Sequence, residues 1–501
     1  MTERDPLFEL EIQPVAKGSR GASHSLYQQL KAAILDGRLK AGTQLPPSRL
    51  SGDLFGVSRN TITEVYARLV SDGLAIGRHG SGTYVSARAR TPPRRRSSSV
   101  PYAGSLNPFW LRPEVTAALA FWREPAERDG SRRQSARVDF RPAMIDSRLF
   151  PFDALRVVMA KQLRGLEKKP AGRKSAQGNQ GNFHLREAIT THIALTRSVV
   201  CDAEDILVTS GAQQAFDLLA RVLVTPNKTV VAMEDPGYPP MRAAFAAAGA
   251  KVVPVGVDAE GLMVEALPDD VNIICVCPSH QFPLGLTMSK RRRRALIEYA
   301  SRRGAVIIED DYDGEFRFEG YSLEALRTAQ HADVVFYIGT FSKCMLPSLR
   351  LGFIVAPKWA RAALIAAKNC LDWHSPTLIQ SAVAKFITDG HLRRHVRRMR
   401  KTYAERRQML LTGLLGGLGK WLRPIPSFYG MHIAAVAAAP LDLEGVARRA
   451  QGKGVMIHTL SRYYVGAEKQ AGLVFGYGVT DPTDIKYGLS MLAQLLTRHK
   501  P

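Results

Sequence analysis

A stretch without hydrophobic periodicity divides the chain into two parts. Residues 87–137 include "ARARTPPRRRSSSVPYAGSLNP", which is rich in Pro, Arg and Ser. The stretch holds eleven Arg against four Asp and Glu, a net charge of +7. It can bury too little apolar surface to form a core, so we interpret it as a linker. Inside it, "NPFWLRPEVTAALAFWRE" (107–124) offers apolar residues suited to a short docking helix. The sequence thus predicts one domain over 1–86 and a larger one over 138–501.

The charge of the whole chain points to an anionic partner. Its formal net charge is +24 and its pI about 10.0, which favours nucleic acid first and an anionic membrane second. No apolar run approaches the length of a spanning helix, and the N-terminus has no apolar signal core. We therefore expect a cytoplasmic protein. Five cysteines in 501 residues do not form a disulfide framework, and without a second close pair of ligands we expect no metal site.

The first part has the pattern of three short helices followed by a hairpin. "HSLYQQLKAAIL" (24–35) places its apolar residues on one helical face. "PPSRLSGDLFG" (46–56) begins with prolines and ends at a glycine. "VSRNTITEVYARLVSDG" (57–73) has Ser58 as an N-cap, with Val65, Leu69 and Val70 packing inward. "LAIGRHGSGTYV" (74–85) then predicts two strands around glycines.

This order predicts a winged helix-turn-helix, an α+β domain whose third helix enters the major groove of double-stranded DNA. A small three-helix structural domain is the alternative. The segment "LPPSRLSGDLFGVSRNTITEVYARLVSDGL" with "GSGTYV" also resembles the DNA-binding domain of the GntR family over residues 22–86. The expected DNA-contacting residues are Arg49, Ser58, Arg59, Asn60, Thr61, Thr63, Arg78, Gly80 and Gly82.

The second part alternates short apolar runs with amphipathic stretches. "DILVTS", "TVVAMED", "NIICVCP", "AVIIEDDY" and "VVFYIG" suit buried parallel strands of an α/β domain. Ligands of such sheets collect where the strands end at their carboxyl side. The chemically distinctive residues of this chain follow these strands.

Three strand ends together describe a site for pyridoxal 5'-phosphate (PLP). After the first, Gly211 allows a tight turn, and the amides of Ala212 and Gln213 suit a phosphate. After another come Asp310 and Tyr312. A carboxylate at a strand end can simply cap the next helix, or it can hold a proton on a heterocyclic nitrogen while the phenol bonds a ring oxygen.

The third strand end carries the lysine. Thr340, Ser342 and Arg350 suit a phosphate monoester, which leaves Lys343 free to form a Schiff base with an aldehyde. A lysine that simply turns back to solvent is the alternative. PLP is the cofactor that needs all of these groups at once.

Several motifs resemble the fold-type I aminotransferase domain: "VTSGAQQAFDLLARVL", "EDPGYPPMR", "CPSHQFPLG", "IIEDDYDGEFR" and "YIGTFSKCMLPSLRLGF". The whole chain resembles a MocR/GabR-type transcriptional regulator, in which a winged helix is fused to such a domain. The resemblance implies that Lys343 forms the internal aldimine, that Asp310 pairs with the pyridine nitrogen, and that Tyr238 packs on the ring. A turn tyrosine that packs locally is the alternative for Tyr238. The resemblance also implies a homodimer, because fold-type I sites lie at a subunit interface.

One departure from the aminotransferase pattern favours a regulator. Aminotransferases commonly carry Asn-Pro-x-Gly where this chain has Phe282-Pro283-Leu284-Gly285, so an amide to the ring hydroxyl is missing. His280 or Gln281 could replace that amide. For the carboxylate of an amino-acid effector we expect Arg462, with a surface arginine as the alternative.

The function expected is a DNA-binding regulator that senses PLP, or an amine or amino acid, through Lys343. The alternative is a metabolic PLP-dependent aminotransferase with an accessory DNA-binding domain. Whether an aminotransferase-type half-reaction remains is left open.

Overall fold

A computed structural model describes residues 21–78, 81–87, 106–121, 136–168, 179–318, 324–331, 333–466 and 469–497. Contacts between residues divide the chain into two compact units, Met1–Leu106 and Asn107–Pro501. The division falls inside the predicted linker, so the second half of that segment belongs to the larger unit.

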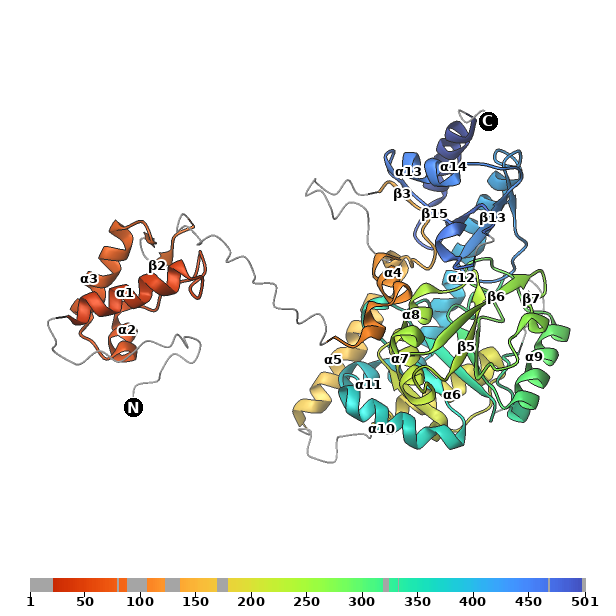
Figure 1. The fold of residues 1–501 in the computed structure, drawn as a ribbon, viewed down its shortest axis with the longest axis horizontal. Coiled ribbons are helices and arrows are strands. Elements are labelled where there is room, and N and C mark those ends of the chain that lie inside the picture. The colour runs from red at the N-terminus through yellow and green to blue at the C-terminus, as the bar shows by residue number, and fades with distance from the viewer. Residues whose placement is uncertain are drawn as a thin grey trace. The chain divides into compact units, whose positions relative to one another are not determined.

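The first unit has the three helices and the hairpin that the sequence predicts (Figure 1). Its elements are α1 (Ala22–Leu35), α2 (Ser48–Phe55), α3 (Arg59–Ser71), β1 (Ala75–Arg78) and β2 (Gly82–Val85). The strands pair antiparallel, from Ala75 opposite Val85 to Arg78 opposite Gly82. Leu69 is fully buried between the helices, but the inward orientation predicted for Val70 is wrong, since its side chain is 40% exposed. Val70 follows Leu69 directly, and a helix turns its next side chain by about 100°.

The second unit is built on a mixed sheet of eight strands in the order β4-β11-β10-β9-β8-β5-β6-β7. They are β4 (Ile206–Thr209), β5 (Val230–Asp235), β6 (Lys251–Asp258), β7 (Gly261–Leu262), β8 (Ile273–Val276), β9 (Val306–Asp311), β10 (Val335–Thr340) and β11 (Gly352–Val355). The five strands predicted from the sequence run parallel to one another. β11 lies antiparallel between β4 and β10. β4 and β10, both predicted from the sequence, therefore run in the same direction but are not hydrogen-bonded to each other, because β11 lies between them.

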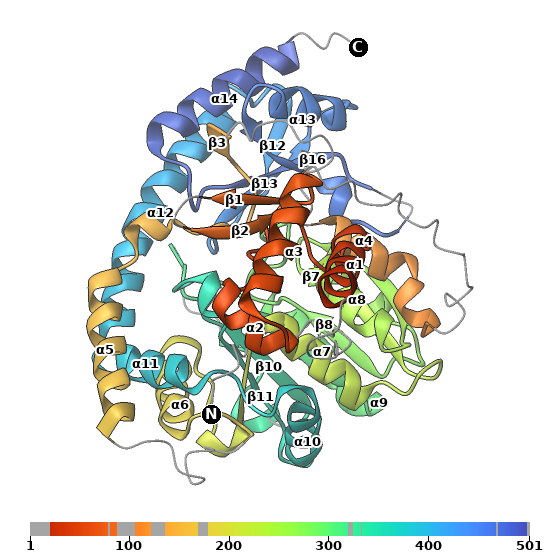
Figure 2. The ribbon, with the colours of Figure 1, turned by 90° about the vertical axis from the view of Figure 1, so that its left-hand side faces the viewer.

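Helices cover both faces of this sheet, which explains the continuous apolar runs of its strands. Along β8, Ile273 and Cys275 pack in the core formed with α7 and α8, whereas Ile274 and Val276 pack in the core formed with α9. Figure 1 shows α7 and α8 over the strands, and Figure 2 shows α11 between α5 and α6. These helices are α5 (Phe152–Lys168), α6 (Phe183–Arg197), α7 (Ala212–Leu223), α8 (Pro239–Ala247), α9 (Lys290–Arg303), α10 (Arg361–Asp372) and α11 (Thr377–Thr388).

A smaller sheet, in the order β12-β13-β16-β15, forms one end of the second unit. Its strands are β12 (Leu422–Pro424), β13 (His432–Ala437), β15 (His458–Thr459) and β16 (Gly472–Gly476), and a separate pair joins β3 (Val138–Asp139) to β14 (Val455–Met456). Three helices accompany this end: α12 (His391–Leu415), α13 (Leu443–Gln451) and α14 (Pro482–Thr497). They lie at the blue end of the colour scale in Figure 1.

The predicted docking helix is present. A short 3-10 helix (Pro108–Leu111) leads into α4 (Pro113–Phe121), which packs along α8. Arg112 anchors its start by donating to the carbonyl oxygens of Ala250 and Ala246, at 2.8 and 3.3 Å. Its last residue, Phe121, is buried in an aromatic cluster that also holds Phe282 and Tyr463.

Among the described residues, none of the helices combines the length and the apolar character that crossing a bilayer requires.

We predict that Leu69→Ala destabilises the first unit alone, by about 2–5 kcal/mol, because it leaves a cavity in a fully buried core. All five tryptophans of the chain lie beyond residue 106, so Trp fluorescence reports only the second unit, whereas circular dichroism reports both. In the full-length variant, the denaturation transition of the first unit should shift while the fluorescence transition stays in place. The exposed neighbour provides the control, Val70→Ala, which should change little. Equal shifts in both transitions would contradict two independently folded units.

Candidate functional site

A cavity of about 350 Å³ lies at the carboxyl ends of β4, β9 and β10. It collects nine of the eleven residues that the sequence analysis assigns to the cofactor. Its lining consists of Ala143, Ala212, Gln213, Phe216, Tyr238, Phe282, Asp310, Tyr312, Thr340, Ser342, Lys343, Pro347 and Arg350. Residues more than 200 positions apart therefore meet at one end of the sheet.

Lys343 follows β10 and reaches into this cavity. Its Nζ donates to the carbonyl oxygen of Ala143 at 2.8 Å. Burial lowers the pKa of Lys343 to about 8, and the carboxylates of Asp313 and Asp310 only partly oppose that shift. A lysine with this pKa has a substantial neutral fraction near physiological pH, and the neutral amine is the form that attacks an aldehyde carbon.

Asp310 lines the cavity at the end of β9. Its carboxyl is buried, and its Oδ1 has no hydrogen-bond partner among the described residues. Burial, with the nearby charges of Asp311 and Asp313, raises the pKa of Asp310 to about 8. A buried carboxyl oxygen without a partner is costly, so the site is suited to a ligand that brings a protonated nitrogen to this oxygen.

Aromatic rings form the side walls. Tyr238 meets Phe216 and Phe282 edge-on, with ring centroids 6.2 and 5.6 Å apart, and Phe282 also meets Tyr312 at 5.8 Å. Such walls fit a flat heterocycle. Tyr238 and Tyr312 are held by this packing, and burial raises the pKa of both phenols.

The opposite end of the cavity presents donors for an anion. Ala212 and Gln213 begin α7, where the first backbone amides have no partner within the helix. Gly211 caps this helix with φ +83°, and a Cβ there would lie 3.3 Å from Nη2 of Arg350. The hydroxyl of Thr340 donates to that of Ser342 at 3.0 Å, and Arg350 donates to the carbonyl oxygen of Ser210 at 3.0 Å. The guanidinium, the hydroxyls and the helix terminus together suit a phosphate monoester.

Two of the predicted residues stand outside the lining. Gly211 lies just behind it, under Arg350. His280 lies behind Tyr312, whose phenol oxygen is 2.8 Å from His280 Nδ1. The other candidate replacement for the missing amide, Gln281, is engaged elsewhere, since it donates to the carbonyl oxygens of Phe282 and of Pro236, which follows β5.

Arg462 lies on a different cavity, of about 490 Å³, beside α4 and α8. It donates to the carbonyl oxygen of Phe121 at 2.9 Å and stands over the Phe121 ring. Phe121 in turn meets Tyr238 edge-on, with centroids 6.4 Å apart. Arg462 is thus separated from the first cavity by a layer of aromatic side chains.

Three residues of the lining were not predicted from the sequence. Phe216 lies one helical turn after Ala212, so the helical period could have placed it on the same side. Ala143 and Pro347 come from irregular segments, and nothing local in the sequence predicts that they reach the cavity.

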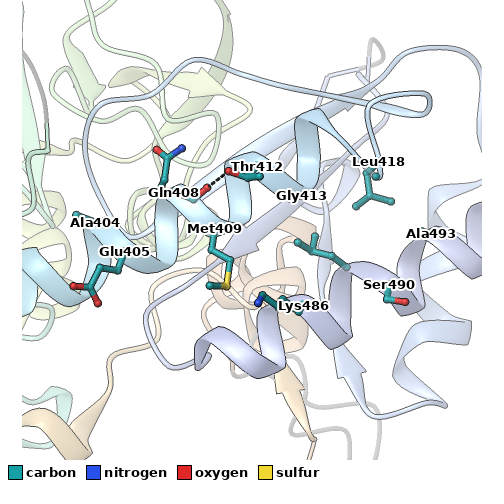
Figure 3. Close-up of a pocket in the computed structure, with 12 residues that line it drawn as sticks. Ala404, Glu405, Gln408, Met409, Thr412, Gly413, Leu418, Lys486, Ser490 and Ala493 are labelled. Carbon is teal, nitrogen blue, oxygen red and sulfur yellow. Dashed lines mark hydrogen bonds between the residues drawn. The ribbon is translucent and has the colours of Figure 1, made fainter.

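A larger cavity, of about 840 Å³, lies between α12 and α14 (Figure 3). Apolar side chains such as Met409 and Leu418 face it, with Lys486 and Glu405 as its charged members. None of the residues that converge at the strand ends lines it. Its charged members do not form the convergent set of groups found in the smaller cavity, so the smaller cavity is the candidate site.

In the first unit, the start of α3 presents polar side chains. Ser58 caps this helix by accepting from the backbone amide of Thr61 at 3.2 Å, as predicted. Arg59 and Asn60 are exposed in the first turn, whereas the Thr63 hydroxyl donates to the carbonyl oxygen of Arg59 within the helix.

The other predicted DNA contacts lie outside α3. Arg49 is exposed on α2, and Arg78, on the hairpin, stands over the Tyr84 ring at 4.9 Å. Gly82 has φ +106°, and Gly80 falls outside the described residues.

Known families match both units. The family described as "Aminotransferase class I and II" matches residues 148–438, and "Bacterial regulatory proteins, gntR family" matches residues 22–85. The chain is 34% identical, over 93% of its length and 92% of the relative, to the "Probable rhizopine catabolism regulatory protein MocR" of Rhizobium meliloti. It is 29% identical, over 93% of its length and 95% of the relative, to the "HTH-type pyridoxine biosynthesis transcriptional regulator PdxR" of Corynebacterium glutamicum.

The crystal structure of an archaeal alanine:glyoxylate aminotransferase has the same fold as most of the chain. The TM-score is 0.70 at 24% identity, covering 80% of this chain and 100% of that one. Fold and site together define a PLP-binding, fold-type I aminotransferase-like domain that follows a gntR-type winged helix. The chain belongs to the aminotransferase class I and II family and, within the gntR-family transcriptional regulators, to the MocR type.

We predict that covalent attachment of PLP speeds up as the pH rises through about 8. Below that pH Lys343 is protonated and has no lone pair to offer, and above it the amine is neutral. Stopped-flow absorbance after mixing with PLP should give a rate profile with its midpoint near the lowered pKa. The control variant is Lys358→Ala, which removes an exposed lysine and should have the same profile as the unaltered protein. A midpoint near the ordinary lysine pKa of 10.5 would contradict the assignment.

Proposed function

We propose that this regulator holds PLP at Lys343 and reads either PLP itself or an amine or amino acid that reacts with it in the same cavity. The observation that carries the proposal is the convergence of Lys343, Asp310 and Arg350 on one cavity in a chain that also has a winged helix. The lysine, the carboxyl with one unpartnered oxygen and the anion-binding end match the aldehyde, the ring nitrogen and the phosphate of PLP.

Each residue has a separate task in this proposal. Lys343 supplies the amine, Asp310 keeps a proton on the ring nitrogen, and the Tyr312 hydroxyl bonds the ring oxygen. Tyr238 packs against the ring. The phosphate is held by Arg350, Thr340 and Ser342 and by the amides of Ala212 and Gln213. PLP, when bound, supplies an electron sink to amines that reach it.

Phe282 favours a regulatory function over the catalytic turnover of amino acids. Its ring lines the cavity where aminotransferases commonly place the amide that bonds the ring hydroxyl. The relatives reported above carry the names of regulators. Sustained conversion of an amino acid is therefore the second candidate, and multiple-turnover assays would reveal it.

An effector carboxylate has one candidate partner in Arg462. In this proposal the Phe121 and Tyr238 rings that separate Arg462 from the PLP cavity move aside, and Arg462 leaves the carbonyl oxygen of Phe121 for the effector, which would loosen the end of α4. Because α4 is the docked part of the segment between the two units, this exchange would link the cavity to the DNA-binding unit.

We also propose a homodimer. α5 exposes a set of apolar side chains that a monomer would leave in water: Phe152, Val157, Leu163 and Leu166, between 42% and 67% exposed. A second copy that covers them would also supply the second winged helix that a two-fold operator requires.

We predict site-selective binding to the DNA upstream of the protein's own gene. Arg59→Ala should weaken it by about 1–3 kcal/mol, because Arg59 is exposed at the start of α3. Fluorescence anisotropy at near-physiological salt measures this for protein stripped of PLP and for protein reloaded with it. The charge-matched control is Arg423→Ala, which removes an exposed arginine of the second unit. This variant should bind the DNA as the unaltered protein does.

Each result of that experiment has a distinct meaning. A response to PLP makes the cofactor part of the switch, and selective binding indifferent to PLP assigns the signal to an amine. Sequence-blind binding that disappears as salt rises would contradict the function, since the charge of +24 alone would explain it.

We predict that Lys343→Ala abolishes the absorbance of lysine-linked PLP and leaves the winged helix folded, because Lys343 lies in the other unit. Borohydride reduction followed by mass spectrometry should find the cofactor attached to Lys343 in the unaltered protein and in Lys358→Ala, but not in Lys343→Ala. Retained absorbance in Lys343→Ala would defeat the assignment.

A further inference from the structure

A buried cluster of three titratable side chains lies directly behind Tyr312. His280 and Asp313 are each 2% exposed, and His432, on β13, is 1% exposed. His280 Nδ1 is 2.9 Å from Asp313 Oδ2 and 2.8 Å from the phenol oxygen of Tyr312. The His280 and His432 rings lie 4.6 Å apart. Of these residues only Tyr312 lines the cavity.

The surroundings of His280 decide where its proton sits. Burial lowers the pKa of His280 to about 3, so the ring is neutral and carries one proton. Its Nε2 is buried without a hydrogen-bond partner. A proton there would be a donor with no acceptor, whereas Nδ1 faces both oxygens of Asp313, at 2.9 and 3.2 Å. The proton therefore belongs on Nδ1.

This placement orients the hydroxyl of Tyr312. A protonated Nδ1 donates and cannot accept, so the Tyr312 proton cannot point to His280. His280 is the one hydrogen-bonding partner of that hydroxyl among the described residues. The Tyr312 proton is thus left to point toward the cavity that the phenol lines.

His432 supports the same arrangement. Its Nε2 donates to the carbonyl oxygen of Pro283 at 3.0 Å, which ties it to the loop that contains Phe282. Burial lowers the pKa of His432 to about 3 as well, so two neutral imidazoles lie side by side without repulsion. The other titratable groups around the cluster are Asp310, Asp311, Glu315 and Lys343.

A metal ion is the competing explanation, because His280, Asp313 and His432 each offer a ligand atom within 4.8 Å of the others. Several polar atoms of the cluster are already engaged in hydrogen bonds. His280 Nδ1 is 2.9 Å from Asp313 Oδ2, and Nε2 of His432 is 3.0 Å from the carbonyl oxygen of Pro283. Gly430 packs closely on one side, since a Cβ there would lie 2.2 Å from His280 Nδ1 and 2.6 Å from Asp313 Oδ2. The cluster has the close contacts of a hydrogen-bonded group and not the opening of a metal site.

We propose that Asp313 and His280 are positioning residues that hold the Tyr312 hydroxyl as a donor into the cavity, toward the ring oxygen of PLP. The amide missing at Phe282 would thus be replaced indirectly, through Tyr312, and not by His280 or Gln281 in the cavity. The proposal rests on the proposed function, since it needs PLP in this cavity.

A double-mutant cycle tests the proposal. Asp313→Asn and Tyr312→Phe should each weaken PLP binding about tenfold and raise by about one unit the pH of the absorbance transition of lysine-linked PLP. The transition pH rises because a ring oxygen that has lost its hydrogen-bond donor is more basic. The proton that it shares with the nitrogen of Lys343 is then lost only at higher pH. The double variant should equal Tyr312→Phe alone. PLP binding is measured by fluorescence quenching and the transition by spectrophotometric titration, with His395→Asn as a control that is buried away from Tyr312.

A second pair of variants tests the proposal if Asp313→Asn does not fold. His280→Asn can still place an amide donor beside Tyr312 and should retain most of the affinity, whereas His280→Leu should lose about tenfold. Additive effects of Asp313→Asn and Tyr312→Phe, or equal losses in His280→Asn and His280→Leu, would overturn the positioning role. If the unaltered protein forms no lysine-linked PLP, the proposed function fails and this proposal fails with it. If it does and the effects are additive, only the positioning role fails.

Discussion

Two ionisable groups, Lys343 and Asp310, whose charges are only partly compensated shape this protein. Among the described residues, Lys343 donates to a backbone carbonyl oxygen alone, and Asp310 has an oxygen with no partner. Burial moves the pKa of each to about 8, so Asp310 holds a proton near neutral pH and Lys343 gives up its proton more easily than an exposed lysine does. Such a pair costs free energy until a ligand supplies an aldehyde for one and a protonated nitrogen for the other. The aromatic walls and the start of α7 are arranged around that requirement.

The sheet makes this cost tolerable. Parallel strands buried on both faces bring β4, β9 and β10 to the same edge, and their ends carry the anion-binding amides, the carboxyl and the lysine. β11 runs antiparallel between β4 and β10 and completes the hydrogen bonding there. The function of a regulator then requires a path out of the cavity. In our proposal Phe121 offers one, because it contacts Tyr238 and ends α4, which lies at the start of the second unit.

In our proposal the cluster behind Tyr312 gives the physical reason why the site can lack an amide at the position of Phe282. An aromatic side chain stands in the cavity where aminotransferases commonly place an amide, and His280 and Gln281 both point elsewhere. A site that keeps the cofactor contacts but changes the support of its ring oxygen is suited to binding and sensing. The names of the relatives agree with that use.

The sequence by itself determined the local elements and most of the site. The five apolar runs became strands because burial on both faces demands continuous apolar residues, and Ser58 capped α3 because its hydroxyl can reach the amide of Thr61. Only the tertiary structure placed His280 behind Tyr312, Arg462 against Phe121, and Ala143 at Lys343. These contacts join residues 32 to 341 positions apart, and no local pattern encodes such distances. They are decided by the packing of whole elements, which also decided that β11 lies between two predicted strands.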